Sequence, residues 1–286
     1  MKQQYSSKSL NKKDKKINFH SKLLTSSFTE FINKNELKYR NNIQPYENEY
    51  NQTDKWVKTI NDGRRNILPI LTSHIDFKGN ILEVGAGSCW FSSELSRISS
   101  VKKVYSLEMS EHILKNIAPS VMLSLNANTH KIVRIIGDFH KLHFPDSFFD
   151  FIVFDASMHH IPTETFSIVM KEICRVLKND GTVVAIREPF LSPIPFFNIN
   201  QKNQFGSHEK KFGVTENIFE KKKFVKLLKK QHFKIYFKYY GFEKKDKSVI
   251  KHCLKTVIYS NIFKEISASL LNYPCIIIIK KDKIIT

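Results

Sequence analysis

Residues 81–89, Ile-Leu-Glu-Val-Gly-Ala-Gly-Ser-Cys, contain residue types that could form a ligand site. Glycine lets a backbone turn sharply and lets a ligand come close, so Gly85 and Gly87 predict a tight turn between a strand and a helix. Glu83 lies beside this turn and would repel a phosphate. The pattern therefore favours a pocket for a cationic or hydroxylated ligand, although a strand-to-helix turn in any α/β protein can have the same sequence.

Two further acidic residues follow predicted strands downstream. Glu108, which precedes Met109, comes 25 residues after Glu83, the spacing at which an acid binds ribose hydroxyls. Asp138 and Phe139 combine a hydrogen-bond acceptor with an aromatic face, which suits an adenine. Taken singly, each acid could instead be a solvated or capping residue. Together they indicate a ligand site at one edge of a sheet.

Residues 155–160, Asp-Ala-Ser-Met-His-His, follow the fourth predicted strand. Asp155 and Ala156 are expected at the ligand. His159 and His160 are the candidate catalytic residues, because an unperturbed imidazole titrates near neutral pH and could accept a proton. The alternative is that both are ordinary loop histidines. Arg187-Glu188 is a second candidate for orienting an acceptor, or else a buried ion pair.

Short strands alternate with amphipathic helices, which indicates βαβ units and a parallel sheet. Gly63 is expected to interrupt a helix over 50–72, and Gly181 to end a helix over 163–178. Ligands of such sheets bind at the carboxyl ends of the strands, near the point where the strand order reverses. Strands are predicted at 81–84, 101–107, 131–136, 149–154, 182–186, 232–239 and 272–281, and further helices at 23–45 and 248–270.

The stretch from residue 80 to 189 resembles the class I S-adenosylmethionine-dependent methyltransferases. Residues 81–87 look like the first motif of that family, and residues 137–150 are similar to its adenine-site loop and the run into the fourth strand. Residues 158–161 resemble the histidine-containing segment after the fourth strand, and residues 172–181 resemble the signature before the fifth strand. Two departures are Cys89, where the family has a third glycine, and Asn179-Asp180, where it has Pro-Gly.

The resemblance implies a Rossmann-like, doubly wound α/β fold, with a mostly parallel seven-stranded sheet and an antiparallel C-terminal strand. It also implies S-adenosylmethionine as the cofactor. The expected cofactor-binding residues are Glu83, Gly85 and Gly87 beside the methionine part, Glu108 and Met109 at the ribose, Asp138 and Phe139 at the adenine, and Asp155 and Ala156 near the sulfonium.

The 286 residues suffice for one large domain with elaborations. We expect a basic, partly mobile extension over 1–50 and a cofactor-binding domain over 51–286. The phenylalanine-rich stretch 189–215 is expected to cover a substrate. No apolar run approaches the ~18 residues that span a bilayer, and no secretion signal is visible, so a cytoplasmic location is expected.

Four cysteines lack CxxC spacing, so neither a metal site nor a disulfide framework is expected. The formal charge of +19 raises the possibility of a nucleic-acid partner, but only 7 of 46 basic residues are arginine. The sequence favours an enzyme that methylates an oxygen or nitrogen of a small molecule. The alternatives are an RNA or other nucleic-acid methyltransferase, and a non-catalytic adaptor. The sequence leaves the oligomeric state open.

Overall fold

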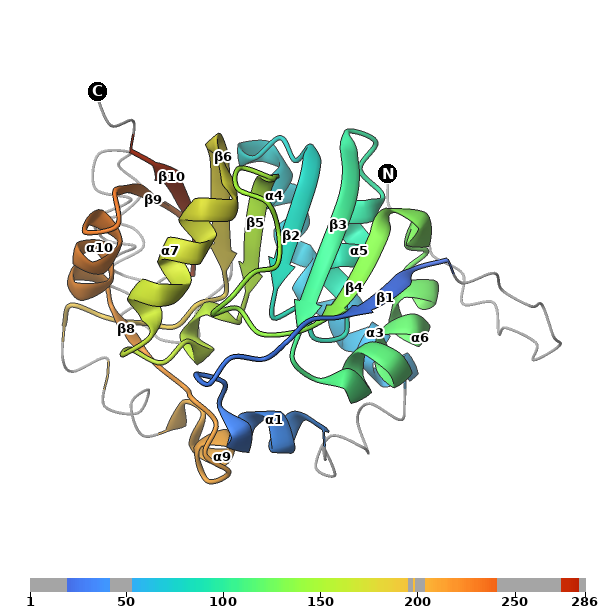
Figure 1. The fold of residues 1–286 in the computed structure, drawn as a ribbon, viewed down its shortest axis with the longest axis horizontal. Helices are drawn as coiled ribbons and strands as arrows, with labels where there is room; N and C mark the ends of the chain where they lie inside the picture. The colour runs from blue at the N-terminus through green and yellow to red at the C-terminus, as the bar shows by residue number, and fades with distance from the viewer. Residues whose placement is uncertain (1–19, 42–52, 195–197, 199–203, 241–273, 283–286) are drawn as a thin grey trace, which may run out of the picture.

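An eight-stranded sheet runs through the centre of the molecule (Figure 1). The computed structural model describes residues 20–41, 53–194, 198, 204–240 and 274–282. The spatial order of the strands is β1-β4-β3-β2-β5-β6-β10-β9. Their bounds are β1 Lys22–Thr25, β2 Gly79–Val84, β3 Val101–Glu108, β4 Ile132–Ile136, β5 Phe149–Asp155, β6 Leu177–Ile186, β9 Phe233–Tyr239 and β10 Cys275–Lys281.

The first six strands in this order pair in parallel, and β10 is antiparallel to both β6 and β9. This confirms the expected α/β fold with a mostly parallel sheet and an antiparallel C-terminal strand. The expected count of seven strands is wrong, because β1 adds to β4 at the edge. With four residues in a polar stretch, and Leu23 and Leu24 as its apolar pair, β1 is too short to show a strand pattern.

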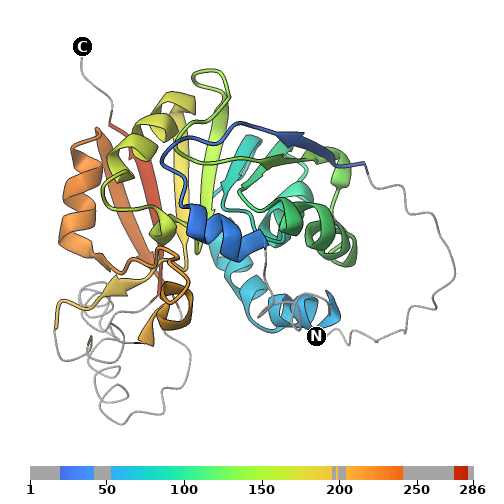
Figure 2. The same ribbon diagram turned by 60° about the horizontal axis from the view of Figure 1, so that its bottom comes forward.

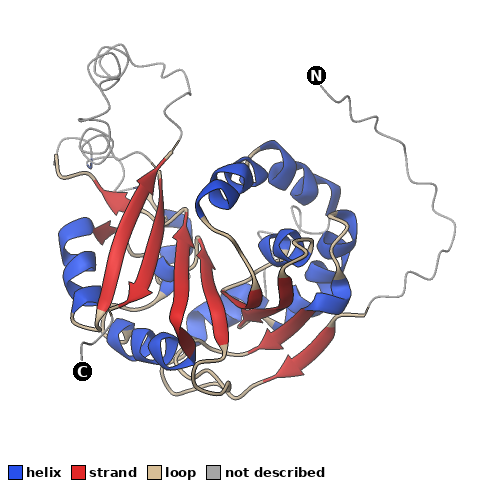
Figure 3. Ribbon diagram, turned by 90° about the horizontal axis from the view of Figure 1, so that it is seen from above, coloured by secondary structure: helices blue, strands red, loops and turns tan. Residues whose placement is uncertain are grey.

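Helices cover both faces of the sheet, as the view from above shows (Figure 3). Six of the seven residues of β5 are buried, because helices cover both faces of a strand at the centre of such a sheet. Ile60, Leu71, Phe91 and Val121 pack on one face, and Val169, Ile173 and Phe224 on the other. The helices are α1 Lys34–Asn41, α3 Thr53–Asp62, α4 Leu68–His74, α5 Trp90–Ser96, α6 Ala118–Ser124, α7 Phe166–Val176, α9 Ser207–Lys210 and α10 Lys221–Lys229, with short turns η1 Arg64–Ile67, η2 Ile113–Ile117, η3 Thr129–Lys131 and η4 Met158–His160.

Several predicted boundaries differ from the observed ones. Gly63 does separate α3 from η1, as expected. Gly181 does not end a helix: α7 ends at Val176, and Gly181 lies inside β6, because Leu177 already pairs with Phe149 across a register shift. The helix expected over 23–45 is β1 followed by α1. The helix expected over 248–270 lies outside the described residues.

The segment from β1 to α1 brings the N-terminal part of the chain beneath the carboxyl ends of the parallel strands (Figures 1 and 2). Asp138 fixes this segment, because its Oδ2 accepts hydrogen bonds from the backbone N (2.8 Å) and Oγ1 (2.6 Å) of Thr29. The boundary expected at residue 50, between an N-terminal extension and the cofactor-binding domain, stays a prediction. β1, which precedes this boundary, pairs with β4 of the main sheet. A small second sheet joins β7 (Phe190–Leu191) to β8 (Phe219–Glu220). Among the described residues, no helix is long and apolar enough to cross a membrane.

Candidate functional site

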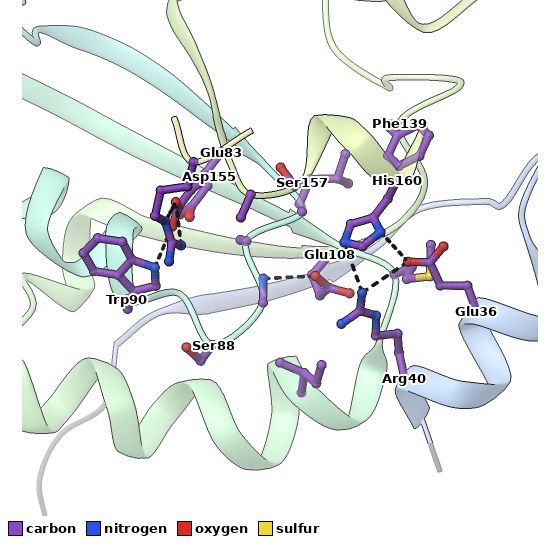
Figure 4. Close-up of a pocket in the computed structure, with 18 of the residues that line it drawn as sticks. Glu36, Arg40, Glu83, Ser88, Trp90, Glu108, Phe139, Asp155, Ser157 and His160 are labelled. Atoms are coloured by element: carbon purple, nitrogen blue, oxygen red, sulfur yellow. Dashed lines mark hydrogen bonds and ion pairs between the residues drawn. The ribbon is translucent and has the colours of Figure 1, made fainter. Parts of the chain in front are cut away.

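A cavity of about 210 Å³ lies at the carboxyl ends of β2, β3 and β5, where the strand order reverses (Figure 4). This is the place where open α/β sheets bind ligands. The structure brings together nine of the eleven residues expected to bind cofactor or act in catalysis: Glu83, Gly85, Gly87, Glu108, Met109, Phe139, Asp155, Ala156 and His160 line the cavity. Asp138 and His159 lie outside its lining.

The two glycines of the turn after β2 have different surroundings. Gly85 has a φ of +70°, and a Cβ there would lie 2.6 Å from the Cβ of Ser157. Gly87 has a φ of +49°, and a Cβ there would meet nothing within 4 Å. Gly85 is therefore needed for packing inside the protein, whereas Gly87 leaves open space on the cavity wall.

Cys89 occupies the position where the resembling family has a third glycine. Its φ is +58°, which explains why glycine suits this position, and it precedes the first residue of α5. The side chain is fully buried, and burial raises the pKa of the thiol far above its usual value. The backbone N of Cys89 donates to the carbonyl O of Ala86 at 2.8 Å, so the turn closes despite the substitution.

Glu108 joins the end of β3 to the glycine turn. Its Oε2 accepts a hydrogen bond from the backbone N of Gly87, and its Oε1 accepts one from the backbone N of Ser110, both at 3.0 Å. These bonds fix the carboxylate at the cavity, and each oxygen keeps a further lone pair. A fixed acceptor beside the open space at Gly87 fits a ligand that carries two adjacent hydroxyls.

Glu83 and Asp155 form the opposite side of the cavity. Glu83 accepts a short hydrogen bond from the hydroxyl of Ser92, and burial raises the pKa of its carboxyl to about 8. Asp155 accepts hydrogen bonds from Trp90 Nε1 at 2.7 Å and from Arg187 Nε at 2.6 Å. The sequence predicted Arg187 either as a group that orients an acceptor or as part of a buried ion pair, and the structure shows an ion pair with Asp155. No pattern in the sequence indicated Trp90.

Asp138 does not face the cavity, and all its observed hydrogen bonds are within the protein. Besides the two bonds from Thr29, its Oδ1 accepts one from the backbone N of His140 and pairs with His140 Nδ1, both at 2.6 Å. Burial raises the pKa of Asp138, but the bonds from His140 and Thr29 outweigh it and lower the value to about 2. Its expected contact with an adenine stays a prediction.

The two candidate catalytic histidines have unlike environments. His160 Nδ1 lies 2.7 Å from the carbonyl O of Thr215, and its Nε2 lies 3.2 Å from Arg40. Burial, then the charges of His159 and Arg40, lower the pKa of His160 well below its usual value, so the ring is neutral. Burial also lowers the pKa of His159, but hydrogen bonds to Glu188 and Glu216 raise it to about 9.

Glu188 organises the turn that carries both histidines. Its Oε1 accepts hydrogen bonds from the backbone N of Ser157 (3.0 Å) and Met158 (2.9 Å), and its Oε2 accepts one from the backbone N of His159 (3.1 Å). The same Oε2 lies 2.7 Å from His159 Nδ1. One buried carboxylate therefore sets both the backbone of η4 and the orientation of a ring.

Glu36 and Arg40 of α1 line one side of the cavity, at the right in Figure 4. They form an ion pair of 3.4 Å, and burial raises the pKa of Glu36 to about 7. The 210 Å³ cavity is smaller than the roughly 300–1,000 Å³ typical of ligand pockets. Nothing in the sequence of 34–41 marks these residues as part of a site.

Comparisons with known proteins identify the central part of the chain. Residues 82–185 match the family model described as a methyltransferase domain. No curated protein sequence matches the chain. Among solved structures, it is similar to a chain of the complex between the Haloferax volcanii Trm112 methyltransferase activator and a methyltransferase, with 12% identity, a TM-score of 0.57, and coverage of 81% of this chain and 98% of that one.

Two further solved structures have the same fold. The PH0226 protein from Pyrococcus horikoshii is 20% identical, with a TM-score of 0.54, and the match covers 86% of this chain and 98% of that one. DhpI, in a complex described as DhpI-SAM-HEP, is 11% identical, with a TM-score of 0.52, and the match covers 86% of this chain and 95% of that one.

Proposed function

We propose that this protein is a class I S-adenosylmethionine-dependent methyltransferase that transfers a methyl group to an oxygen or nitrogen of a small molecule. Its cofactor is S-adenosylmethionine, whose sulfonium supplies an already activated methyl group when bound. The observation that carries the proposal is the cavity at the reversal of strand order, with the Glu108 carboxylate fixed beside the open space at Gly87.

The lining residues suit the parts of this cofactor. Glu108, with Met109 next to it, would accept hydrogen bonds from the ribose hydroxyls, and Phe139 would stack on the adenine. The glycine turn and Glu83 would hold the methionine part, and Asp155 and Ala156 would lie near the sulfonium. Because the leaving group is already activated, the protein contributes mainly positioning and exclusion of water.

A hydroxyl or amine acceptor also has to lose a proton, and His160 is the better placed of the two histidines. It lines the cavity, whereas His159 does not. His159 is protonated near neutral pH, because its hydrogen bonds to Glu188 and Glu216 outweigh burial and raise its pKa to about 9. Since Arg40 lies 3.2 Å from His160 Nε2, the acceptor has to replace this contact.

The expected covering role of residues 189–215 draws support from the part of this stretch that is described. Phe205 makes an edge contact with His159, with 5.5 Å between ring centroids, and Phe212 packs on Tyr39 of α1 at 5.1 Å. Aromatic side chains from this stretch therefore lie over the histidines and against the helix that lines one side of the cavity. A substrate bound at His160 would lie under them.

Methyl transfer is tested by incubating the full chain with S-adenosylmethionine labelled in its methyl group and with fractionated metabolites or RNA. We expect label in a small molecule. Label in RNA would favour the alternative, which the charge of +19 supports, and binding that weakens steeply with salt would accompany it. Cofactor binding without transfer to any fraction would favour the adaptor. A cytoplasmic location stays a prediction.

The role of the histidines is tested by replacing both with glutamine. We expect the methylation rate to fall by about 10²–10⁴, the usual contribution of general acid–base catalysis, with cofactor affinity unchanged. His74, an exposed histidine at the end of α4, gives the control His74→Gln. A double variant that stays within about threefold of the wild-type rate would show that no proton transfer from these rings is needed.

A further inference from the structure

Three ionisable side chains cluster beside the cofactor cavity, with donor atoms within 4.8 Å of one another, and a fourth side chain, a carboxylate, lies near one of them. They are His159 and His160 of η4, Glu216 of the segment before β8, and Glu36 of α1. Glu216 Oε2 lies 3.5 Å from His159 Nε2, and Glu216 Oε1 lies 3.6 Å from His160 Nδ1. Glu36 Oε1 lies 3.8 Å from the same Nδ1. Residues far apart in the sequence therefore present two imidazoles and two carboxylates to a common space.

These distances are longer than those of most hydrogen bonds, which peak near 2.9–3.0 Å. With metal–nitrogen and metal–oxygen bonds of about 2.0–2.1 Å, two ligand atoms on one tetrahedral ion are roughly 3.3 Å apart. The donor atoms of His159, His160 and Glu216 lie within 4.8 Å of one another, so they would have to approach by up to about 1.5 Å to bind one ion.

Glu216 supplies an independent reason to expect a cation. Its side chain is 7% exposed, and its two carboxylate oxygens face the rings of His159 and His160 at 3.5 and 3.6 Å. A buried carboxylate is costly unless positive charge lies beside it, and a bound cation would supply that charge.

His159 already has the surroundings of a metal ligand. Glu188 Oε2 lies 2.7 Å from its Nδ1, so a proton stays on Nδ1, and an ion that displaces the proton of Nε2 would meet a lone pair directed at Glu216. A carboxylate that holds the far nitrogen of a ligating histidine is a regular feature of metal sites. No motif in the sequence indicates this cluster, because an adjacent histidine pair followed by a glutamate 56 residues later matches no metal spacing.

We propose that His159, His160 and Glu216, with Glu36 as a fourth donor, bind one divalent transition-metal ion. Two imidazoles with carboxylates suit zinc, iron(II) or manganese(II). His160 has to exchange its contact with the carbonyl O of Thr215 for the ion. Because His160 also lines the cofactor cavity, the ion would lie at the cavity wall. Both histidines would then act by holding the ion, and metal content distinguishes this role from proton transfer.

The test is equilibrium dialysis of the full chain against zinc chloride or manganese chloride, followed by elemental analysis. We expect one ion per chain at micromolar free metal. Glu216→Gln should weaken binding by at least about tenfold, and Glu188→Gln by a similar factor. Glu220→Gln, which changes an exposed glutamate in β8, and His74→Asn are the matched controls and should bind like the wild type.

Equal metal content in Glu216→Gln and Glu220→Gln would overturn the proposal, and so would a wild-type chain without bound metal. A cobalt(II) titration of the wild type decides the matter if the variants do not fold. Cobalt(II) bound by protein side chains should absorb visible light, and this absorption should saturate at one ion per chain. If the spectrum stays that of cobalt(II) in water, the site is refuted. S-adenosylmethionine affinity is also measured after the metal has been removed with a chelator. This measurement tests the cofactor site independently of the metal site.

Discussion

Gly85 and Gly87 lie on the same turn, but substitution should affect them differently. A Cβ at Gly85 would overlap the Cβ of Ser157, whereas a Cβ at Gly87 would enter the cavity. Gly85→Ala should lower the free energy of unfolding by about 1–3 kcal/mol through overpacking. Gly87→Ala should cost about 1 kcal/mol from its φ of +49°, yet weaken S-adenosylmethionine binding at least about tenfold. Denaturant unfolding and calorimetry measure the two effects, and the reverse pattern would refute this assignment of the turn.

Glu108 tests the ribose site directly. Hydrogen bonds to a charged group contribute about 1.5–3 kcal/mol, so Glu108→Ala should weaken S-adenosylmethionine binding by about 10–100-fold in calorimetry. Glu111→Ala removes an exposed glutamate three residues further on and is the control. Unchanged affinity in Glu108→Ala would place the ribose elsewhere.

The residues that line the cavity were predictable where a strand end carries them. Glu83, Glu108 and Asp155 lie near or at the carboxyl ends of β2, β3 and β5, and parallel pairing alone brings such positions together. Glu36 and Arg40 were not predictable, because they reach the cavity through a tertiary contact of α1. In the sequence, Trp90 is typical of a core residue. Its hydrogen bond to Asp155 depends on how α5 is placed against the sheet.

At the scale of elements, the segment from β1 to α1 depends on one buried acid. Asp138 holds Thr29 and His140 together, and its pKa of about 2 lies below the ordinary 3.8. A lowered pKa stabilises the fold above the unfolded value, and the contribution disappears as the pH falls through the folded value. It amounts to about 2 kcal/mol at neutral pH, with about half remaining at pH 3.

This gives a pH-dependent prediction for Asp138→Asn. The difference in unfolding free energy between wild type and variant should be constant from pH 7 to pH 5 and shrink from there to pH 3. Urea titrations at each pH measure it. Asp62→Asn, a substitution at the last residue of α3, is the control and should show no such trend. A difference that stays the same at pH 3 would mean that Asp138 is not the group that holds this segment.

At the scale of the whole molecule, helix and strand alternation was enough to predict the α/β fold, because each buried strand is an apolar run between amphipathic helices. The eighth strand was missed because β1 is held by its pairing with β4 rather than by its own apolar pattern. The charge of +19 did not locate a site, since lysines are spread along the chain.

Cofactor binding should be visible in the stability of the whole chain. A ligand at 100 times its dissociation constant adds about 2.7 kcal/mol to the folded state. For a chain of 286 residues, this corresponds to a rise of about 4–5 °C in Tm. Differential scanning fluorimetry with S-adenosylmethionine should show the shift, with free methionine as the control. The shift should be much smaller in Glu108→Ala, and an equal shift would mean that the cofactor binds at another place.

Alkylation of Cys89 would report how often the glycine turn opens. The thiol is fully buried between β2 and α5 and strongly disfavours the reactive thiolate, so an alkylating reagent can reach it only when the turn separates from the sheet. Its labelling rate therefore measures how often the wall of the cavity opens. At the position where the family has glycine, this chain therefore has a thiol whose alkylation rate reports the opening of the turn.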